Sequence, residues 1–288
     1  MCLAPYAGAV TGPAWQSYDA IADVYERVAA LCHAQMARDL VAAVAPSFGA
    51  RVLDLGAGTG VAAQAASAAV GADGVVVAAD PSSALLRRAD TPRLHRVAAA
   101  APGLPFADAA FDVVVANLVV GLFEDYSVAL ADLARVLRVG GRLAVTTWGR
   151  LDRDPDIDDA DERAAFSAWE TVVADRIDLD KADAATEEAL PWLHAFADFD
   201  FLQAALADAK LSVVDVVGRA YRFPLSHIDW LGRMHTSARG RYARAVLGDD
   251  GVDALSADVL AALRTAGIPD PIHCADEIVM TVAVLGRT

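Results

Sequence analysis

Short apolar runs alternate with stretches of helical spacing over the first half of the chain. The runs predict buried strands at 51–55, 75–79, 95–99, 113–116 and 143–148, and the spacing between them predicts helices near 60–70, from 81 onward and at 127–138. Strands and helices that follow one another through short loops imply right-handed crossovers and a parallel sheet. The pattern therefore predicts an α/β fold.

The regular alternation stops after residue 148. Residues 150–200 are interpreted as an insertion that opens with an acidic segment and continues with helical patches at 166–173 and 187–196. The rest of the chain is expected to contain a helix at 199–209, a strand at 211–223, a helical stretch at 227–263 and a strand at 278–286. The two long β-branched runs suit an antiparallel pair at the end of the sheet. No repeat or second domain is evident, so residues 1–288 are expected to form one domain.

Helical spacing also runs from residue 15 to about residue 45, ahead of the first strand. Tyr18, Ile21, Tyr25 and Val28 fall on one face of this predicted helix. Packing of an amphipathic helix against a core can explain the stripe by itself. A helix that also covers a binding site is the alternative.

The stretch 51–60, Arg-Val-Leu-Asp-Leu-Gly-Ala-Gly-Thr-Gly, joins the end of a strand to the start of a helix. Glycine lets the backbone adopt positive φ and approach a ligand closely. The helix start adds unpaired N–H groups and the positive end of a dipole. The spacing is G-x-G-x-G rather than the dinucleotide pattern G-x-G-x-x-G, and no Gly-Lys-Ser/Thr follows. The stretch therefore predicts a ligand-binding loop that is neither a P-loop nor a NAD site, and the alternative is a glycine turn of the kind found in any α/β protein.

Asp80 ends the second predicted strand, directly beside the first. Open parallel sheets bind ligands at the carboxyl ends of their strands, and a carboxylate there can accept hydrogen bonds from both hydroxyls of a ribose. Pro81 and Ser82 suit the first turn of the next helix. Asn117 ends the fourth strand at the same edge. Helix capping is the alternative role for Asp80.

Four segments together resemble the class I S-adenosylmethionine (SAM)-dependent methyltransferases of the UbiE-like, methyltransferase type 11 group. They are the glycine stretch, Y-D-x-x-A-x-x-Y at 18–25, L-P-F-x-D-x-x-F-D at 104–112, and Gly-Gly-x-Leu at 140–143. The chain departs from the family pattern at Val139, where proline is usual, and at Ala100, where an acid often binds the adenine amino group. It also lacks the histidine that is common after the fourth strand.

The resemblance implies a Rossmann-like, seven-stranded class I methyltransferase sheet in the order 3-2-1-4-5-7-6, with only strand seven antiparallel and with a helical lid insertion. The implied parts are an N-terminal helical lid at 15–45, a SAM-binding core at 46–150, a helical insertion or lid at 150–200, and a C-terminal part at 201–288 with the last strand pair. The implied SAM-binding residues are Tyr18, Asp54, Gly56, Ala57, Gly58, Gly60, Asp80, Pro81, Ser82, Ala100, Ala101, Asn117 and Leu118.

The implied reaction moves a methyl group from SAM to an N, O or C atom of a small, partly apolar metabolite, such as a natural-product intermediate. Alignment of two reactants supplies much of the rate of such a reaction, and a general base helps an oxygen or carbon nucleophile. His235 and His194 lie in segments expected to cover the site and are the candidate bases. The expected acceptor-site residues are Tyr25, Trp148, Trp192 and Trp230. For each of these residues, a role in packing alone is the alternative.

Two further alternatives keep the fold and change the role, because fold does not fix function. The chain could be a SAM-binding cyclase or rearrangement enzyme that transfers no methyl group, or a catalytically silent binding subunit. Formation of S-adenosylhomocysteine during turnover separates methyl transfer from both.

Composition narrows the expected partners. The 288 residues carry a net charge of −15, with an isoelectric point near 4.6, which argues against nucleic acid or an anionic membrane as a partner. Cys2, Cys32 and Cys274 are widely spaced, which fits a reducing cytoplasm, and no basic residue precedes Arg27, as a signal peptide would require. No metal-ligand spacing is found. A small-molecule substrate is expected, with SAM as cofactor and no metal, and a homodimer is left open.

Overall fold

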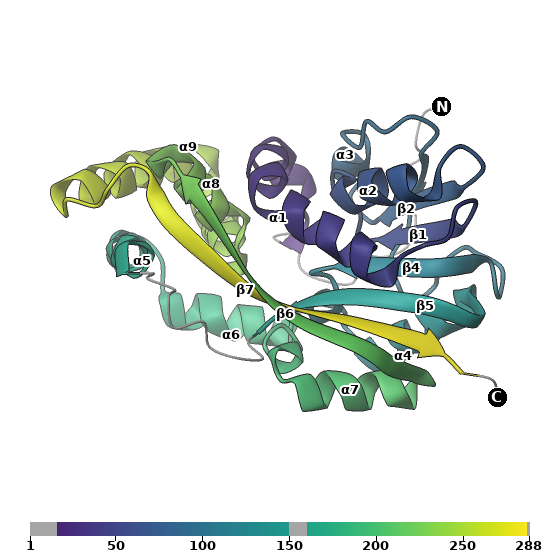
Figure 1. Cartoon of the computed structure of the whole chain (residues 1–288). Helices are drawn as coiled ribbons and strands as arrows, with labels where there is room; N and C mark the ends of the chain where they lie inside the picture. Colours follow the sequence, from purple (N-terminus) through teal and green to yellow (C-terminus); the bar gives the residue numbers. More distant parts are fainter. Residues whose placement is uncertain (1–15, 150–159, 287–288) are drawn as a thin grey trace.

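One mixed sheet runs through the chain. In the computed structural model, which describes residues 16–149 and 160–286, seven strands form this sheet in the order β3-β2-β1-β4-β5-β7-β6 (Figure 1). The strands are β1 (Arg51–Leu55), β2 (Val75–Asp80), β3 (His95–Ala98), β4 (Phe111–Asn117), β5 (Leu137–Trp148), β6 (Leu211–Leu225) and β7 (Ile272–Leu285). β7 is antiparallel to both β5 and β6, and the other neighbouring strands are parallel. The predicted strand order and the single antiparallel strand are confirmed.

Helices cover both faces of the sheet. The α-helices in the described residues are α1 (Ala22–Val44), α2 (Val61–Val70), α3 (Ser83–Leu86), α4 (Tyr126–Val136), α5 (Ala160–Ala174), α6 (Leu179–Ala189), α7 (Phe199–Asp208), α8 (His227–Thr236) and α9 (Ala238–Thr265), and 3₁₀ turns lie at η2 (Asp19–Ile21), η3 (Val120–Leu122) and η4 (Ala195–Ala197). α1 and α2 pack on one face, and α4 and α7 pack on the other (Figure 1).

The two-sided cover explains why the strands are continuously apolar. In β1, Val52 packs with the α1 and α2 face, whereas its neighbour Leu53 packs with the α4 and α7 face. Both side chains are fully buried. Because successive side chains of a strand point to opposite faces, a strand covered on both sides needs an apolar residue at nearly every position.

α1 connects the sheet to a second group of helices. Met36 and Leu40, in its C-terminal half, are buried against the sheet. Val28 and Cys32, nearer its start, are buried in a separate apolar cluster with residues of α5, α8 and α9. At about 1.5 Å of rise per residue, this one helix is long enough to touch both regions.

The last two strands extend beyond the rest of the sheet. β7 pairs with β5 only as far as Trp148 opposite Ile278, but its pairing with β6 continues to Leu225 opposite Ile272. The projecting part forms a two-stranded arm (220–225 with 272–277) that leads into α8 (Figure 1). The expected strands at 211–223 and 278–286 were too short, because the added part of β7 carries His273, Asp276 and Glu277 and so lacks a continuous apolar run, although burial alternates along it.

The arm carries a group of helices made of α5, α6, α8 and α9, which is called the lid for its predicted role. Trp169 and Trp230 are buried at its centre together with Leu225 of the arm. Ion pairs hold its parts together: Arg233 of α8 reaches Asp276 of β7 at 2.5 Å. Arg239 of α9 reaches Glu170 of α5 and Asp183 of α6, both at 2.5 Å. The insertion is thus packed against the C-terminal helices.

The insertion differs from the prediction in its second half. A helix was expected at 187–196, but α6 ends at Ala189 and a turn leads to η4. Leu190 adopts φ −134° and ψ 62° ahead of Pro191. Proline disfavours the α conformation in the residue before it and lacks an N–H donor, so the helix stops there.

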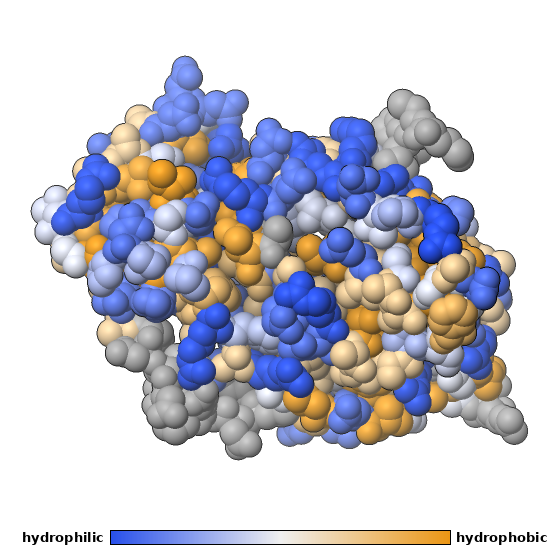
Figure 2. Space-filling model, turned by 45° about the horizontal axis from the view of Figure 1, so that its top comes forward, coloured by the Kyte–Doolittle hydropathy of each residue, from blue (hydrophilic) through white to orange (hydrophobic). Residues whose placement is uncertain are grey.

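Figure 2 shows polar and charged groups spread over much of one face of the molecule, with hydrophobic groups between them. No helix in the part of the chain that the structure describes is both long and apolar enough to cross a membrane. Residue 15, where the N-terminal lid was expected to begin, and the acidic stretch at 152–159 lie outside the described residues.

Candidate active site

The glycine loop leaves β1 at the carboxyl edge of the sheet and ends at the first turn of α2. Gly56, Gly58 and Gly60 all have positive φ, at 63°, 54° and 83°. A Cβ atom on Gly56 would lie 2.4 Å from a methyl carbon of Val119, and one on Gly60 would lie 2.7 Å from Ala89 Cβ. The loop therefore needs glycine both for its backbone conformation and for its close packing.

Asp80 links the glycine loop to the start of α3. Its Oδ2 accepts a hydrogen bond from the Gly58 N–H, and its Oδ1 accepts one from the Ser82 N–H, both at 2.8 Å. Ser82 also caps α3, because its Oγ accepts from the Leu85 N–H at 3.1 Å. Each carboxylate oxygen can accept a second hydrogen bond, so Asp80 keeps acceptor capacity for a ligand. Pro81, between them, is exposed.

Asp54 lies under the same loop and is almost completely buried. Its Oδ2 accepts from the Ala63 N–H in the first turn of α2 at 2.7 Å. Burial raises the pKa of Asp54 to about 8, and the nearby Asp80 contributes to the rise. Burial also raises the pKa of Asp80 to about 6, against the opposing effect of its two backbone hydrogen bonds. At neutral pH the loop therefore sits between one largely protonated and one largely ionised carboxyl group.

The end of β4 is fixed by a side chain of β5. Thr146 donates from Oγ1 to Asn117 Oδ1 and accepts from the Leu118 N–H, both at 2.8 Å. Leu118 has a positive φ of 59°, a conformation that non-glycine residues rarely adopt. Strained backbone of this kind is held where the surrounding structure demands it, often at functional sites.

Residues from the N-terminal segment cover the loop. Tyr25 of α1 packs on Gly58: a Cβ there would lie 3.3 Å from its ring and 3.5 Å from its hydroxyl oxygen. Tyr18 meets the Tyr25 ring edge-on, at 5.3 Å between centroids. Asp19 anchors this segment, because its Oδ1 accepts from Ser82 Oγ at 2.5 Å and from the Ala84 N–H at 3.2 Å. Tyr18 precedes η2 rather than lying on the helix, since α1 begins only at Ala22.

Ala100 and Ala101 follow β3, beside the end of β2. The adjacent Ala99 N–H donates to the Asp80 carbonyl oxygen at 3.2 Å. Ala101 is buried, whereas Ala100 is half-buried. Similarly, the Ala57 N–H donates to the Ala79 carbonyl oxygen at 3.1 Å. These backbone bonds bring the three loops that follow β1, β2 and β3 to one edge of the sheet.

The two histidines proposed as bases occupy different surroundings. His235 lies in the lid, where its Nε2 is 3.0 Å from Ser256 Oγ of α9. Burial, assisted by Arg244, lowers its pKa to about 4. His194 is exposed in the turn before η4. A third histidine, His33 of α1, lies 6.3 Å from Tyr25 between ring centroids, and burial lowers its pKa to about 4. The assignment of a base stays a prediction.

The tryptophans expected around the acceptor are mostly engaged in packing. Trp230 has no exposed surface within the lid. Trp192 donates from Nε1 to the Glu124 carbonyl oxygen at 3.1 Å and stacks on Phe201. Trp148, at the carboxyl end of β5, is 38% exposed. Of the three, Trp148 alone combines exposure with a position at the strand edge that carries the glycine loop.

Arg241 of α9 was missed by sequence reasoning. Its guanidinium carbon lies 4.3 Å from the centroid of the Tyr18 ring, and the residue is only 5% exposed. Thr146 and Asp19 were also missed. Among Arg241, Thr146 and Asp19, only Asp19 had a sequence signal, because it lies in the Y-D-x-x-A-x-x-Y segment at 18–25 that carries the family resemblance.

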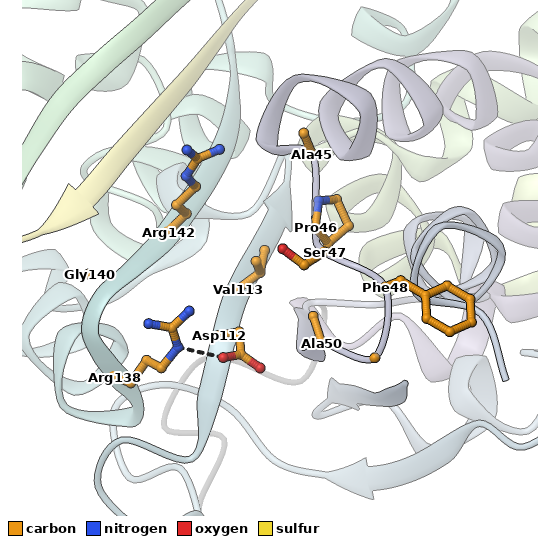
Figure 3. A pocket seen from close by; sticks show the side chains of 11 residues that line it. Ala45, Pro46, Ser47, Phe48, Ala50, Asp112, Val113, Arg138, Gly140 and Arg142 are labelled. Carbon is orange, nitrogen blue, oxygen red and sulfur yellow. Dashed lines mark hydrogen bonds and ion pairs between the residues drawn. The ribbon is translucent and has the colours of Figure 1, made fainter. Parts of the chain in front are cut away.

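A hollow of about 430 Å³ lies away from this site (Figure 3). Its lining joins the end of α1 and the loop before β1 to Asp112, Arg138 and Arg142. Asp112 and Arg138 form an ion pair at 2.5 Å. Asp112 stands at the amino end of β4 and the two arginines in the amino-terminal half of β5, whereas the glycine loop and Asp80 stand at carboxyl ends. The hollow is therefore not part of the candidate site.

Comparison with known proteins finds similar sequences and similar folds. A family profile described as "Methyltransferase domain" matches residues 53–145. A demethylmenaquinone methyltransferase of Clavibacter sepedonicus is 42% identical over 109 residues, which are 36% of this chain and 43% of that protein. A malonyl-[acyl-carrier protein] O-methyltransferase of Pseudescherichia vulneris is 39% identical over 141 residues, 48% of this chain and 52% of that protein. The chain thus spans about half the length of the curated relatives it matches.

The fold extends the likeness beyond the matched segment. One solved structure of similar fold is phospholethanolamine N-methyltransferase 2 of Haemonchus contortus, in complex with phosphomonomethylethanolamine and S-adenosylhomocysteine. It superposes with a TM-score of 0.54 at 17% sequence identity, and the match covers 94% of this chain and 58% of that one. Residues 53–145 therefore match a methyltransferase domain, the chain is similar in sequence to demethylmenaquinone and UbiE methyltransferases, and it has the class I methyltransferase fold.

Proposed function

We propose that this chain is a SAM-dependent methyltransferase that acts on a small, partly apolar metabolite. The observation that carries the proposal is the position of Asp80, a buried carboxylate bonded to the Gly58 and Ser82 N–H groups at 2.8 Å. It stands beside a loop whose three glycines have positive φ. The match to a methyltransferase domain over 53–145 supports the same reading.

The residues present fit SAM. The three glycines of the loop have positive φ and carry no side chain, so the backbone after β1 can approach a ligand closely. The Asp80 carboxylate suits a ribose, Asp54 lies under the part of the loop where the amino-acid end is expected, and the Ala100–Ala101 backbone lies where adenine is expected. When bound, SAM supplies an electrophilic methyl group. The chain itself contributes position, exclusion of water by Tyr18 and Tyr25, and fixed charges.

The names of the relatives describe carbon and oxygen methylation of different compounds, and they do not fix the methyl acceptor of this chain. The profile match ends at residue 145, whereas the lid that faces the acceptor in our proposal is built from α5, α6, α8 and α9. We propose that Trp148 lines the acceptor site, because it is exposed at the carboxyl end of β5. We place the enzyme in the cytoplasm, since Cys32 and Cys274 are free thiols.

A direct test combines binding and turnover. The protein is titrated with S-adenosylhomocysteine by calorimetry, and then incubated with SAM and fractionated small-molecule extract, with mass spectrometry for a product that has gained one methyl group. Methyl transfer requires that S-adenosylhomocysteine and the methylated product form in equal amounts. Binding without S-adenosylhomocysteine formation in any fraction that the protein alters would instead identify a cyclase or rearrangement enzyme. Failure to bind either nucleoside would refute the proposal.

A further inference from the structure

Arg241 is a buried cation without a matching anion. Its side chain comes from the first turn of α9, and its Nη1 donates to the Thr236 carbonyl oxygen at 3.0 Å. Its Nε is buried and has no hydrogen-bond partner among the described residues. No carboxylate in residues 16–149 or 160–286 forms an ion pair with it. A buried charge is costly unless it is paired, so the fold retains this guanidinium at a disadvantage in the free protein.

The position of Arg241 connects it to the candidate site. The guanidinium lies over the face of Tyr18, within cation–π distance at 4.3 Å. Tyr18 contacts Tyr25, and Tyr25 rests on Gly58. Arg241 is also close enough to Tyr25 to affect its phenol electrostatically, together with Asp54 and Asp80. Two carboxyl groups and one arginine therefore lie close to Tyr25.

We propose that Arg241 is the oxyanion-binding residue of this site and that it takes a carboxylate group of a bound ligand, with the Tyr18 ring holding the guanidinium plane in place. Arginine offers a planar fork of donors that matches a carboxylate, and the buried Nε donor of this fork has no partner among the described residues. The proposal rests on the proposed function, since it assumes a ligand on the glycine loop.

The carboxylate can come from two sources. One is the methionine end of SAM, whose ammonium group would then face the Asp54 side of the loop. The other is an anionic methyl acceptor that enters under the lid. Both place the same chemical group against Arg241, and a pair of matched ligands distinguishes them.

The first arm compares S-adenosylhomocysteine with S-adenosyl-3-thiopropylamine, which is the same molecule without its carboxylate. Wild type, Arg241→Gln and Arg241→Lys are titrated by calorimetry. Loss of a charge-assisted hydrogen bond predicts that Arg241→Gln binds S-adenosylhomocysteine about 10- to 100-fold more weakly. Its affinity for the carboxylate-free ligand should not change. Arg241→Lys, which keeps the charge but loses the fork, should fall between wild type and Arg241→Gln.

The second arm tests the acceptor source. Benzoate and benzamide are added to the protein saturated with S-adenosylhomocysteine, and binding is followed by saturation-transfer NMR. If the acceptor supplies the carboxylate, wild type binds benzoate and not benzamide, and Arg241→Gln loses benzoate binding while it keeps its affinity for S-adenosylhomocysteine.

Arg244→Gln is the matched control, because Arg244 lies one turn further along α9 and pairs with Asp249. Melting temperature checks that each variant is folded. If Arg241→Gln does not fold, Tyr18→Leu, which removes only the ring under the guanidinium, is compared on the same ligands and should lower the affinity for S-adenosylhomocysteine or for benzoate.

The proposal is overturned if the Arg241 variants bind S-adenosylhomocysteine as wild type does and benzoate binding is absent or equal in all of them. Wild type that binds neither S-adenosylhomocysteine nor its carboxylate-free analogue would overturn the proposed function as well. The two failures are therefore distinguishable.

Discussion

Binding of SAM should release a proton from Asp54. The free protein buries this carboxyl group under the glycine loop, and its pKa rises to about 8. At neutral pH most molecules therefore carry Asp54 protonated. The ammonium group of SAM, facing Asp54 on the same loop, would favour the ionised form, because an opposite charge nearby lowers the pKa of a carboxyl group.

The magnitude follows from the two carboxyl groups of the site. At pH 7, a group with a pKa of about 8 holds about 0.9 of a proton, and Asp80, with a pKa of about 6, holds about 0.1. If ligand binding brings both groups well below pH 7, about one proton leaves per molecule bound. By linkage, affinity should rise with pH by nearly tenfold per pH unit between about 6 and 8, and level off above that range.

Calorimetry measures this directly. The observed binding enthalpy at pH 7 is compared in buffers of different ionisation enthalpy, and the slope gives the number of protons released. Asp54→Asn is the control, since the amide oxygen can still accept from the Ala63 N–H but no proton can leave. The slope should fall from about one to near zero in this variant. A wild-type slope of zero, or an equal slope in Asp54→Asn, would refute the reasoning.

Three further outcomes are expected. Asp80→Ala should weaken S-adenosylhomocysteine binding by roughly 1.5–3 kcal/mol in calorimetry, because charge-assisted hydrogen bonds are lost; unchanged affinity would remove Asp80 from the site. Asp54→Asn should flatten the pH dependence of the unfolding free energy in urea. Because the folded pKa of Asp54 is raised, its contribution makes the wild-type free energy of unfolding fall by at most roughly 5 kcal/mol as pH rises from about 4 to about 8. A difference in unfolding free energy between the two proteins that stays constant with pH would contradict this. Tyr18→Ala should weaken S-adenosylhomocysteine binding more than Tyr18→Phe; a lower melting temperature with unchanged affinity in Tyr18→Ala would show that Tyr18 only packs.

The core of the site was predictable because its determinants are local in sequence. Gly56, Gly58 and Gly60 lie within five residues, and the strands that bring Asp80 beside them are marked by continuous apolar runs. A helix start and a strand end require only short-range patterns. The order of the sheet came from the resemblance, since periodicity alone does not say which strand is antiparallel.

The lid contacts were not predictable in the same way. Arg241 reaches the Tyr18 ring across more than two hundred residues of sequence, and an arginine on a helix gives no sign of whether it will be buried. Trp230 suggested a pocket wall but lies in a packed interior, because a large apolar side chain stabilises either setting. Nothing in the sequence around Leu118 indicates a positive φ. Its N–H donates a hydrogen bond to Oγ1 of Thr146 on the next strand, a contact that sequence patterns do not show.

The place of β7 between β5 and β6 constrains the order in which the protein can be made. β6 is the edge strand of the described sheet and pairs only with β7, which follows it in the chain by 46 residues of helix and loop. As the chain leaves the ribosome, β6 and the exposed edge of β5 must wait for residues 272–285 before either can be paired. Unpaired strand edges promote aggregation. The growing chain therefore depends on protection of these two edges, by its own helices or by a chaperone, until its last strand is synthesised.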